Sequence, residues 1–185
     1  MVEVWSKKVR IFHSLLILSI VVAFVLEDKK EIHEIAGYTA LLLVLFRIFY
    51  GLIAKNRYER LSSLFFPPSE IWAFVKSVMK FAEKRYLGHN PLAGLVMFAM
   101  LVTIATMAIT GGVGYAMKEE EGILALFVTP NFELGKEILG IHKILSQILL
   151  GLIGMHLMGV IVSSIQTKEN YIRAIFGDGK KKEEK

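Results

Sequence analysis

Four of the five histidines in this chain stand on apolar segments, at spacings that suit metal ligation. His142 and His156 lie fourteen residues apart on the last apolar segment. At about 100° and ~1.5 Å per residue, fourteen steps bring a helix to within roughly 40° of its starting azimuth and span ~21 Å. Both imidazoles therefore point to one side of one helix, near its opposite ends. His13 and His33 lie on two other apolar segments, where each can meet one of them.

Four apolar stretches must position these histidines, and each is roughly long enough for a ~30 Å hydrocarbon core. They cover residues 9–26, 32–54, 91–115 and 138–165. Of the 185 residues, 54% are hydrophobic and the mean hydropathy is +0.52, whereas about 45–50% apolar is usual in a soluble domain. The sequence predicts an all-α, integral-membrane four-helix bundle over residues 1–177. A charged, disordered cytoplasmic tail is expected at residues 178–185.

Lysine and arginine residues indicate the orientation of these spans. Sixteen of them fall in the N-terminal segment, the connection between the second and third spans and the C-terminal tail, against five at the opposite ends of the spans. The positive-inside rule then places both termini in the cytoplasm, which predicts a multi-pass protein of the inner membrane in contact with lipid. Because the net charge of +5 surrounds apolar spans, it indicates topology and argues against nucleic-acid binding.

The two longer connections have patterns of their own. From Ile71 to Phe81 apolar residues recur at helical spacing with lysines between them, after a Pro-Pro-Ser start in which Ser69 is the expected cap. The sequence therefore predicts a cytoplasmic interfacial helix over residues 71–86. On the outer side, residues 118–136 form a connection whose apolar part, 123–128, either dips into the interface or meets a partner.

With this orientation, the four histidines fall at two depths. His13 lies near the cytoplasmic end of the first span, ~20 Å below its outer end, and His33 opens the second span at the outer face. The expected pairs are His13 with His156 and His33 with His142. A lone histidine at such a place is more often structural than ligating, but two matched heights favour ligation. Two axial imidazoles suit electron transfer, so we expect two hemes b, held non-covalently because the chain has no cysteine.

Other residues near these heights suggest supporting roles. Arg47 is expected to hold a heme propionate, whereas for Arg10 contact with lipid headgroups competes with that role. Lys143 either serves the outer heme or anchors the flank of its helix. His89 has no partner at its height and is expected not to ligate, although it suits a quinone or propionate site. Small residues beside the ligands admit either a macrocycle or a neighbouring helix: Gly37, Gly140, Gly151, Gly154 and Gly159.

Several motifs resemble the prokaryotic cytochrome b561 and nickel-hydrogenase b-type cytochrome superfamily. They are Val4–Trp5–Ser6 followed by Arg10–Ile11–Phe12–His13, Ile32–His33–Glu34–Ile35–Ala36–Gly37–Tyr38 running on to Leu45–Phe46–Arg47, Leu87–Gly88–His89–Asn90–Pro91–Leu92–Ala93–Gly94, and His142 with His156. The resemblance implies a four-helix bundle with two b hemes ligated from the first, second and fourth helices, hence by His13, His33, His142 and His156. It departs at Trp5–Ser6–Lys7, which lacks the acidic residue often found before the arginine.

The expected function is electron transfer across the membrane. As the resemblance implies, electrons pass between an outer-side redox protein, of hydrogenase or cytochrome c type, and the quinone pool of a respiratory chain. The chain is then the membrane subunit of a hydrogenase- or dehydrogenase-type oxidoreductase. The alternatives are a stand-alone quinone-linked oxidoreductase, similar to a superoxide oxidase, and a transporter that uses the histidines for a metal ion or for protons.

Overall fold

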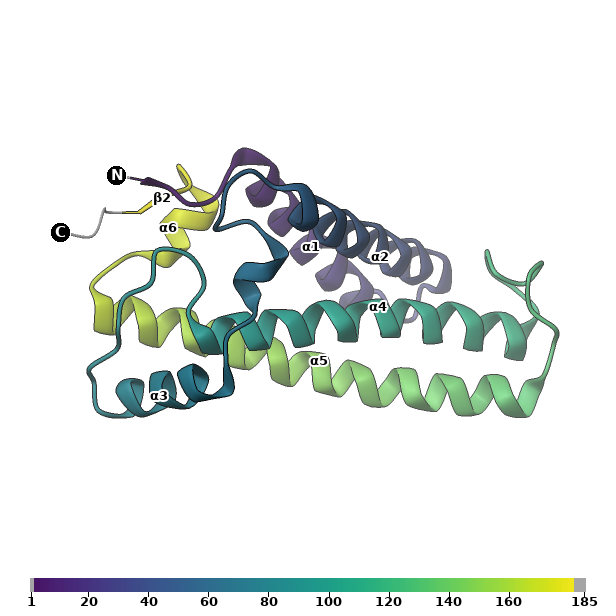
Figure 1. The fold of residues 1–185 in the computed structure, drawn as a ribbon. Coiled ribbons are helices and arrows are strands. Elements are labelled where there is room, and N and C mark those ends of the chain that lie inside the picture. The colour runs from purple at the N-terminus through teal and green to yellow at the C-terminus, as the bar shows by residue number, and fades with distance from the viewer. Residues whose placement is uncertain (1, 182–185) are drawn as a thin grey trace. The chain divides into compact units, whose positions relative to one another are not determined.

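A computed structural model describes residues 2–181, whose regular secondary structure is almost entirely helical (Figure 1). In chain order the elements are β1 (Val2–Glu3), α1 (Lys7–Val25), α2 (Lys30–Ile53), the 3-10 helix η1 (Leu61–Leu64), α3 (Pro68–Met79), α4 (Pro91–Glu119), α5 (Phe132–Thr167), α6 (Tyr171–Phe176) and β2 (Lys180–Lys181). The all-α class expected from the sequence is confirmed.

Helices α1, α2, α4 and α5 are each long and apolar enough to cross a membrane. Their lengths run from 19 residues in α1 to 36 in α5, or ~28 to ~54 Å at 1.5 Å per residue. All four expected spans are therefore present, with the last two longer than expected. Many of their apolar side chains face outward, among them Leu42 at 67% and Ile165 at 68% exposure. An apolar surface of this kind is suited to lipid. The helical backbone is suited to it as well, because a helix satisfies its own backbone hydrogen bonds.

Contacts within the chain define two compact units, each built from parts of all four long helices. The unit that we call the distal unit comprises residues 15–45 and 100–151. Its α4 and α5 approach closely, because a Cβ on Gly135 would lie 2.9 Å from the Gly114 carbonyl oxygen. The start of α5 is capped by Asn131, whose Oδ1 accepts a hydrogen bond from the Leu134 amide at 3.1 Å.

The unit that we call the terminal unit comprises residues 1–14, 46–99 and 152–185. Its apolar core consists of Val4, Trp5, Val9 and Ala174. Strand β1 pairs antiparallel with β2, so that Val2 faces Lys181, and the Gly179 carbonyl accepts hydrogen bonds from the amides of Val4 and Trp5. The segments that contain β1 and β2 are thereby joined.

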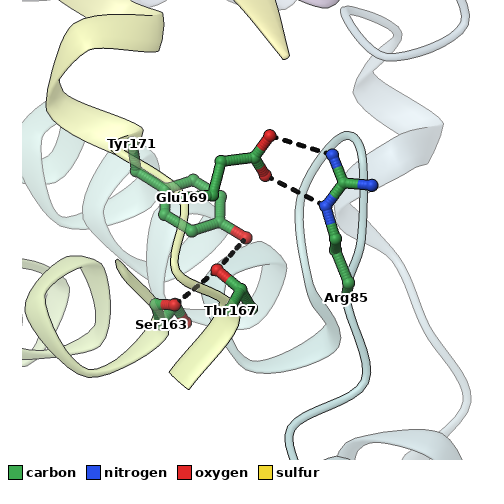
Figure 2. Close-up of polar contacts among 5 residues, drawn as sticks. All are labelled: Arg85, Ser163, Thr167, Glu169 and Tyr171. Atoms are coloured by element: carbon green, nitrogen blue, oxygen red, sulfur yellow. Dashed lines mark hydrogen bonds and ion pairs between the residues drawn. The ribbon is translucent and has the colours of Figure 1, made fainter. Parts of the chain in front are cut away.

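In the terminal unit an ion pair joins the segment after α3 to the turn between α5 and α6, and a hydroxyl contact lies beside it (Figure 2). Arg85 donates from Nε and NH2 to the two carboxylate oxygens of Glu169, at 3.2 and 2.9 Å. The Thr167 hydroxyl donates to the Ser163 carbonyl at 2.7 Å and lies 3.5 Å from the Tyr171 hydroxyl. A bidentate, partly buried pair of this kind fixes geometry better than an exposed one.

The structure differs from the sequence expectations for α3 and for the start of the C-terminal tail. Helix α3 begins at Pro68, with Pro67 as its cap, and ends at Met79, because Phe81 has a φ of +54° that leaves the helical region. Ser69 is therefore not the cap, and residues 80–86 are not helical. Within the expected tail, Lys180 and Lys181 form β2, since the N-terminal strand supplies hydrogen-bonding partners; residues 182–185 lie outside the described part.

Candidate functional site: two histidine pairs

The distal unit brings together His33 from α2 and His142 from α5. Their ring centroids lie 6.0 Å apart and their planes meet at 73°. Each ring is held by a main-chain carbonyl: His33 Nδ1 lies 2.8 Å from the Ala23 oxygen, and His142 Nδ1 lies 2.9 Å from the Met107 oxygen. Because a carbonyl can only accept, each Nδ1 carries the proton and each Nε2 keeps its lone pair for a metal.

These two histidines also line a cavity within the distal unit. All four long helices contribute to its otherwise apolar wall, which consists of Ile20, Ala23, Phe24, Gly37, Ala40, Ile104, Met107, Ala108 and Leu149 besides the two histidines. Gly37 leaves one wall open, since a Cβ there would meet nothing within 4 Å.

The terminal unit brings together His13 from α1 and His156 from α5. Their ring centroids lie 6.4 Å apart, with an interplanar angle of 54°. Phe176 of α6 presents an edge contact to His13, with centroids 5.6 Å apart. His13 Nδ1 is buried and has no hydrogen-bond partner. Both pairings expected from the sequence thus occur in the structure as ring contacts.

The separation of each pair fits one metal ion between two imidazoles. A bond from a first-row transition metal to an imidazole nitrogen is about 2 Å, and the ring centre lies roughly 1.1 Å beyond that nitrogen, so two opposed rings have centres about 6.2 Å apart. The observed 6.0 and 6.4 Å bracket this value. Within residues 2–181 no group of three or more His, Cys, Asp or Glu side chains is placed to hold a bare ion. Two ligands suit a metal whose other four come from a macrocycle.

Arg47 is a buried cation in the terminal unit, with only 6% of its surface exposed. Its NH1 group is buried without a partner, and a Cβ on Gly51 would come within 2.5 Å of that atom. Nearby, the buried Glu59 carboxylate accepts hydrogen bonds from the Ser6 amide and from the Tyr50 hydroxyl. The unpartnered guanidinium nitrogen suits a further carboxylate, because buried charges require partners.

The other two cations expected near the cofactors differ from Arg47. Arg10 donates through NH1 to the Gly177 carbonyl, which ties α1 to the C-terminal segment, while its Nε is buried without a partner. Lys143 is exposed and does not line the cavity beside His142. Its position favours the role of a flanking anchor on α5.

His89, the fifth histidine, lies in the terminal unit, where its ring contacts Trp5. Its ring packs on Trp5 with centroids 4.7 Å apart, and its Nδ1 lies 3.3 Å from the Ser63 hydroxyl. Burial, together with the smaller effect of the positive charges of Arg47 and Lys181, lowers the pKa of His89 to about 3. At neutral pH His89 is therefore an uncharged group beside the Arg47 site.

The glycines near the histidines separate into two classes. At Gly37, Gly140, Gly151, Gly154 and Gly159 an added Cβ would meet nothing within 4 Å, so close helix packing does not explain them; of these five, Gly37 lines the distal cavity and the other four do not. Gly111, which the sequence analysis did not single out, is different: its Cβ would lie 2.9 Å from the His142 ring. Sequence alone also gave no sign of the Ala23 and Met107 carbonyls, since every residue carries a carbonyl whatever its side chain.

Comparison with known proteins agrees with the geometry. The sequence model of the prokaryotic cytochrome b561 family matches residues 4–178, almost the whole chain. No curated protein and no solved structure is matched. The matched range contains all four paired histidines and four helices able to span a membrane. The chain therefore belongs to the prokaryotic cytochrome b561 family of membrane-embedded, heme-binding b-type cytochromes that transfer electrons.

Proposed function

We propose that this protein carries two b hemes, one between His33 and His142 and one between His13 and His156. The observation that carries the proposal is the ring separation of 6.0 and 6.4 Å, which matches two imidazoles on opposite sides of one iron. The free Nε2 of His33 and His142 and the apolar cavity beside them support the same assignment.

Each bound heme supplies a one-electron couple between ferric and ferrous iron. The chain determines how that couple is used. His33 and His142 would hold one heme and His13 and His156 the other, and in the distal unit apolar side chains would surround the bound group. The Ala23 and Met107 carbonyls fix the tautomer and the orientation of His33 and His142.

Arg47 is proposed to bind a propionate of the heme in the terminal unit. Its buried NH1 has no partner, and a propionate would complete its hydrogen bonding with a charge-assisted contact. Neutral His89 lies close enough to Arg47 and His156 for a positive charge on either of them to lower its pKa. Arg10 is the weaker candidate for binding a propionate, because its NH1 already donates a hydrogen bond to the Gly177 carbonyl.

Electrons are proposed to cross the inner membrane between an outer-side redox protein and the quinone pool. Helix α5 carries one histidine of each pair, fourteen residues apart, so a single helix links both centres. The terminal unit holds seventeen basic and eight acidic residues. By the positive-inside rule that unit lies toward the cytoplasm, together with both termini.

The charge of the distal unit favours a protein partner over a small anion. It carries nine acidic and five basic side chains, a net charge of −4, and the 120–131 connection exposes Leu126 and Phe127 at 91% and 79%. An acidic surface repels superoxide and attracts a protein with a basic face. The chain is therefore proposed to act as the membrane subunit of an oxidoreductase, or with a c-type cytochrome, in preference to a stand-alone superoxide-oxidising enzyme.

The test is a reduced-minus-oxidised visible spectrum of the purified protein, with heme counted per chain and low-spin ferric signals recorded by electron paramagnetic resonance. We expect two b hemes with bis-imidazole signals. His156→Ala should remove one heme and spare the other, and His33→Ala should do the converse. Equal loss of both hemes in a folded variant would contradict the pairing. A colourless protein that binds a metal ion or moves protons would instead favour a transporter.

A further inference from the structure

His13 of the terminal pair differs from both histidines of the distal pair in the hydrogen bonding of its Nδ1 atom. In the distal pair both Nδ1 atoms have main-chain acceptors, the Ala23 and Met107 oxygens, at 2.8 and 2.9 Å. In the terminal pair, His13 Nδ1 is buried with no acceptor, and its ring neighbour is the edge of Phe176. The same ligand type therefore meets unequal surroundings in the two units.

Such a difference acts directly on a bound iron. An imidazole that donates its Nδ1 proton to a carbonyl becomes a more basic ligand, because electron density moves toward Nε2. A more basic ligand stabilises the ferric ion relative to the ferrous ion and so lowers the midpoint potential. An imidazole with no acceptor lacks this effect. Ligand hydrogen bonding alone thus separates the potentials of two otherwise similar centres.

We propose that the Ala23 and Met107 carbonyls, together with the space left by Gly111, set the distal centre at a lower midpoint potential than the terminal centre. This inference rests on the proposed two-heme function. A single electron added to the protein then resides mainly at the His13–His156 centre. Transfer between the centres moves one electron: the distal iron is oxidised as the terminal iron is reduced, and no bond is made or broken.

Two neighbouring residues on α4 control the His142 hydrogen bond. Gly111 is required by space, since a Cβ there would lie 2.9 Å from both Nδ1 and Cε1 of His142. An added methyl group must displace the ring from the Met107 oxygen. Thr110 acts on the acceptor: its hydroxyl lies 2.8 Å from the Thr106 oxygen and 3.2 Å from the Met107 oxygen. Thr110 thus competes with His142 for the same carbonyl.

These contacts predict shifts of opposite sign in two variants of the full-length, heme-loaded protein. In a spectroelectrochemical titration, Gly111→Ala should raise the lower of the two midpoint potentials, because His142 loses its acceptor. Thr110→Val, which has nearly the same shape, should lower that potential, because His142 no longer shares the carbonyl. The higher potential should remain unchanged in both. Gly140→Ala is the matched control, since its Cβ meets nothing within 4 Å, and it should shift neither potential.

Assignment of the lower potential uses single-heme variants. His156→Ala should retain the low-potential heme, and His33→Ala the high-potential one; the reverse assignment, or equal potentials, overturns the inference while leaving the two-heme function intact. Shifts of the same sign in Gly111→Ala and Thr110→Val overturn it as well. If Gly111→Ala does not fold, Thr110→Val alone decides the sign. A protein with fewer than two bis-imidazole hemes refutes the proposed function itself.

Discussion

Gly37 lies on the wall of the distal cavity beside His33, and it offers a way to block that cavity without touching a ligand. An added Cβ there would meet nothing within 4 Å, so Gly37→Leu can be accommodated when the cavity is empty. A leucine side chain at this position would add four carbons to the lining of that cavity. A macrocycle bound there must then overlap the side chain.

The expected cost follows from overpacking, which is typically about 1–3 kcal/mol. At about 1.4 kcal/mol per tenfold change, affinity for the distal heme should fall by roughly 5-fold to 100-fold. The heme-to-protein ratio, measured by pyridine haemochrome at limiting heme, should decline toward one per chain, with the high-potential heme retained. Gly140→Leu is the control, because it has the same free space but does not line the cavity. Two unchanged hemes in Gly37→Leu would refute the placement of a heme in this cavity.

Three further predictions address the partner, the His89 site and the α5 cap. Three exposed acidic groups of the distal unit can be removed together by Glu120→Gln, Glu133→Gln and Glu137→Gln. This variant should exchange electrons with a lysine-rich c-type cytochrome about tenfold more slowly at low salt, whereas neutralising the exposed Lys55, Lys80 and Lys168 of the terminal unit should not slow the exchange. Equal stopped-flow rates for the acidic variant and the unmodified protein would argue against an acidic docking face. The pKa of His89 is about 3 in the folded protein and 6.5 in the unfolded chain, so the unfolded chain binds more protons between pH 3 and pH 6.5. The free energy of unfolding should therefore fall on acidification in this range by up to about 1.4 kcal/mol per pH unit. In thermal unfolding curves His89→Phe should show a weaker dependence of stability on pH. Asn131→Ala should lower stability by about 1 kcal/mol through loss of the α5 cap, detectable in the same unfolding assay, and no change would mean that the Leu134 amide finds another acceptor.

The spans and the histidine pairs were predictable because they depend on periodic, long-range regularities. Apolar length identifies each membrane helix, and helical rise then fixes the heights of His13, His33, His142 and His156. The structure places His33 beside His142 in one unit and His13 beside His156 in the other. Arg47 was singled out for the same reason, as a charge placed deep in an apolar span.

What sequence could not reveal depends on local backbone geometry. Helix α3 ends at Met79 because Phe81 adopts a positive φ, which no apolar pattern reports. The carbonyls that hold His33 and His142 belong to Ala23 and Met107, residues with no polar side chain to attract notice. The role of Gly111 likewise depends on how closely α4 approaches the His142 ring.

The pairing of β1 with β2 implies an order of assembly during synthesis. All residues of the distal unit have been made once the chain reaches residue 151. The surroundings of His13, by contrast, require Phe176, and Val4 and Trp5 require the carbonyl of Gly179. Contacts between residues so far apart in the sequence close a long loop and form late. The His33–His142 pair is therefore ready for its cofactor earlier, and the surroundings of the His13–His156 pair are completed only after Phe176 and Gly179 have been made.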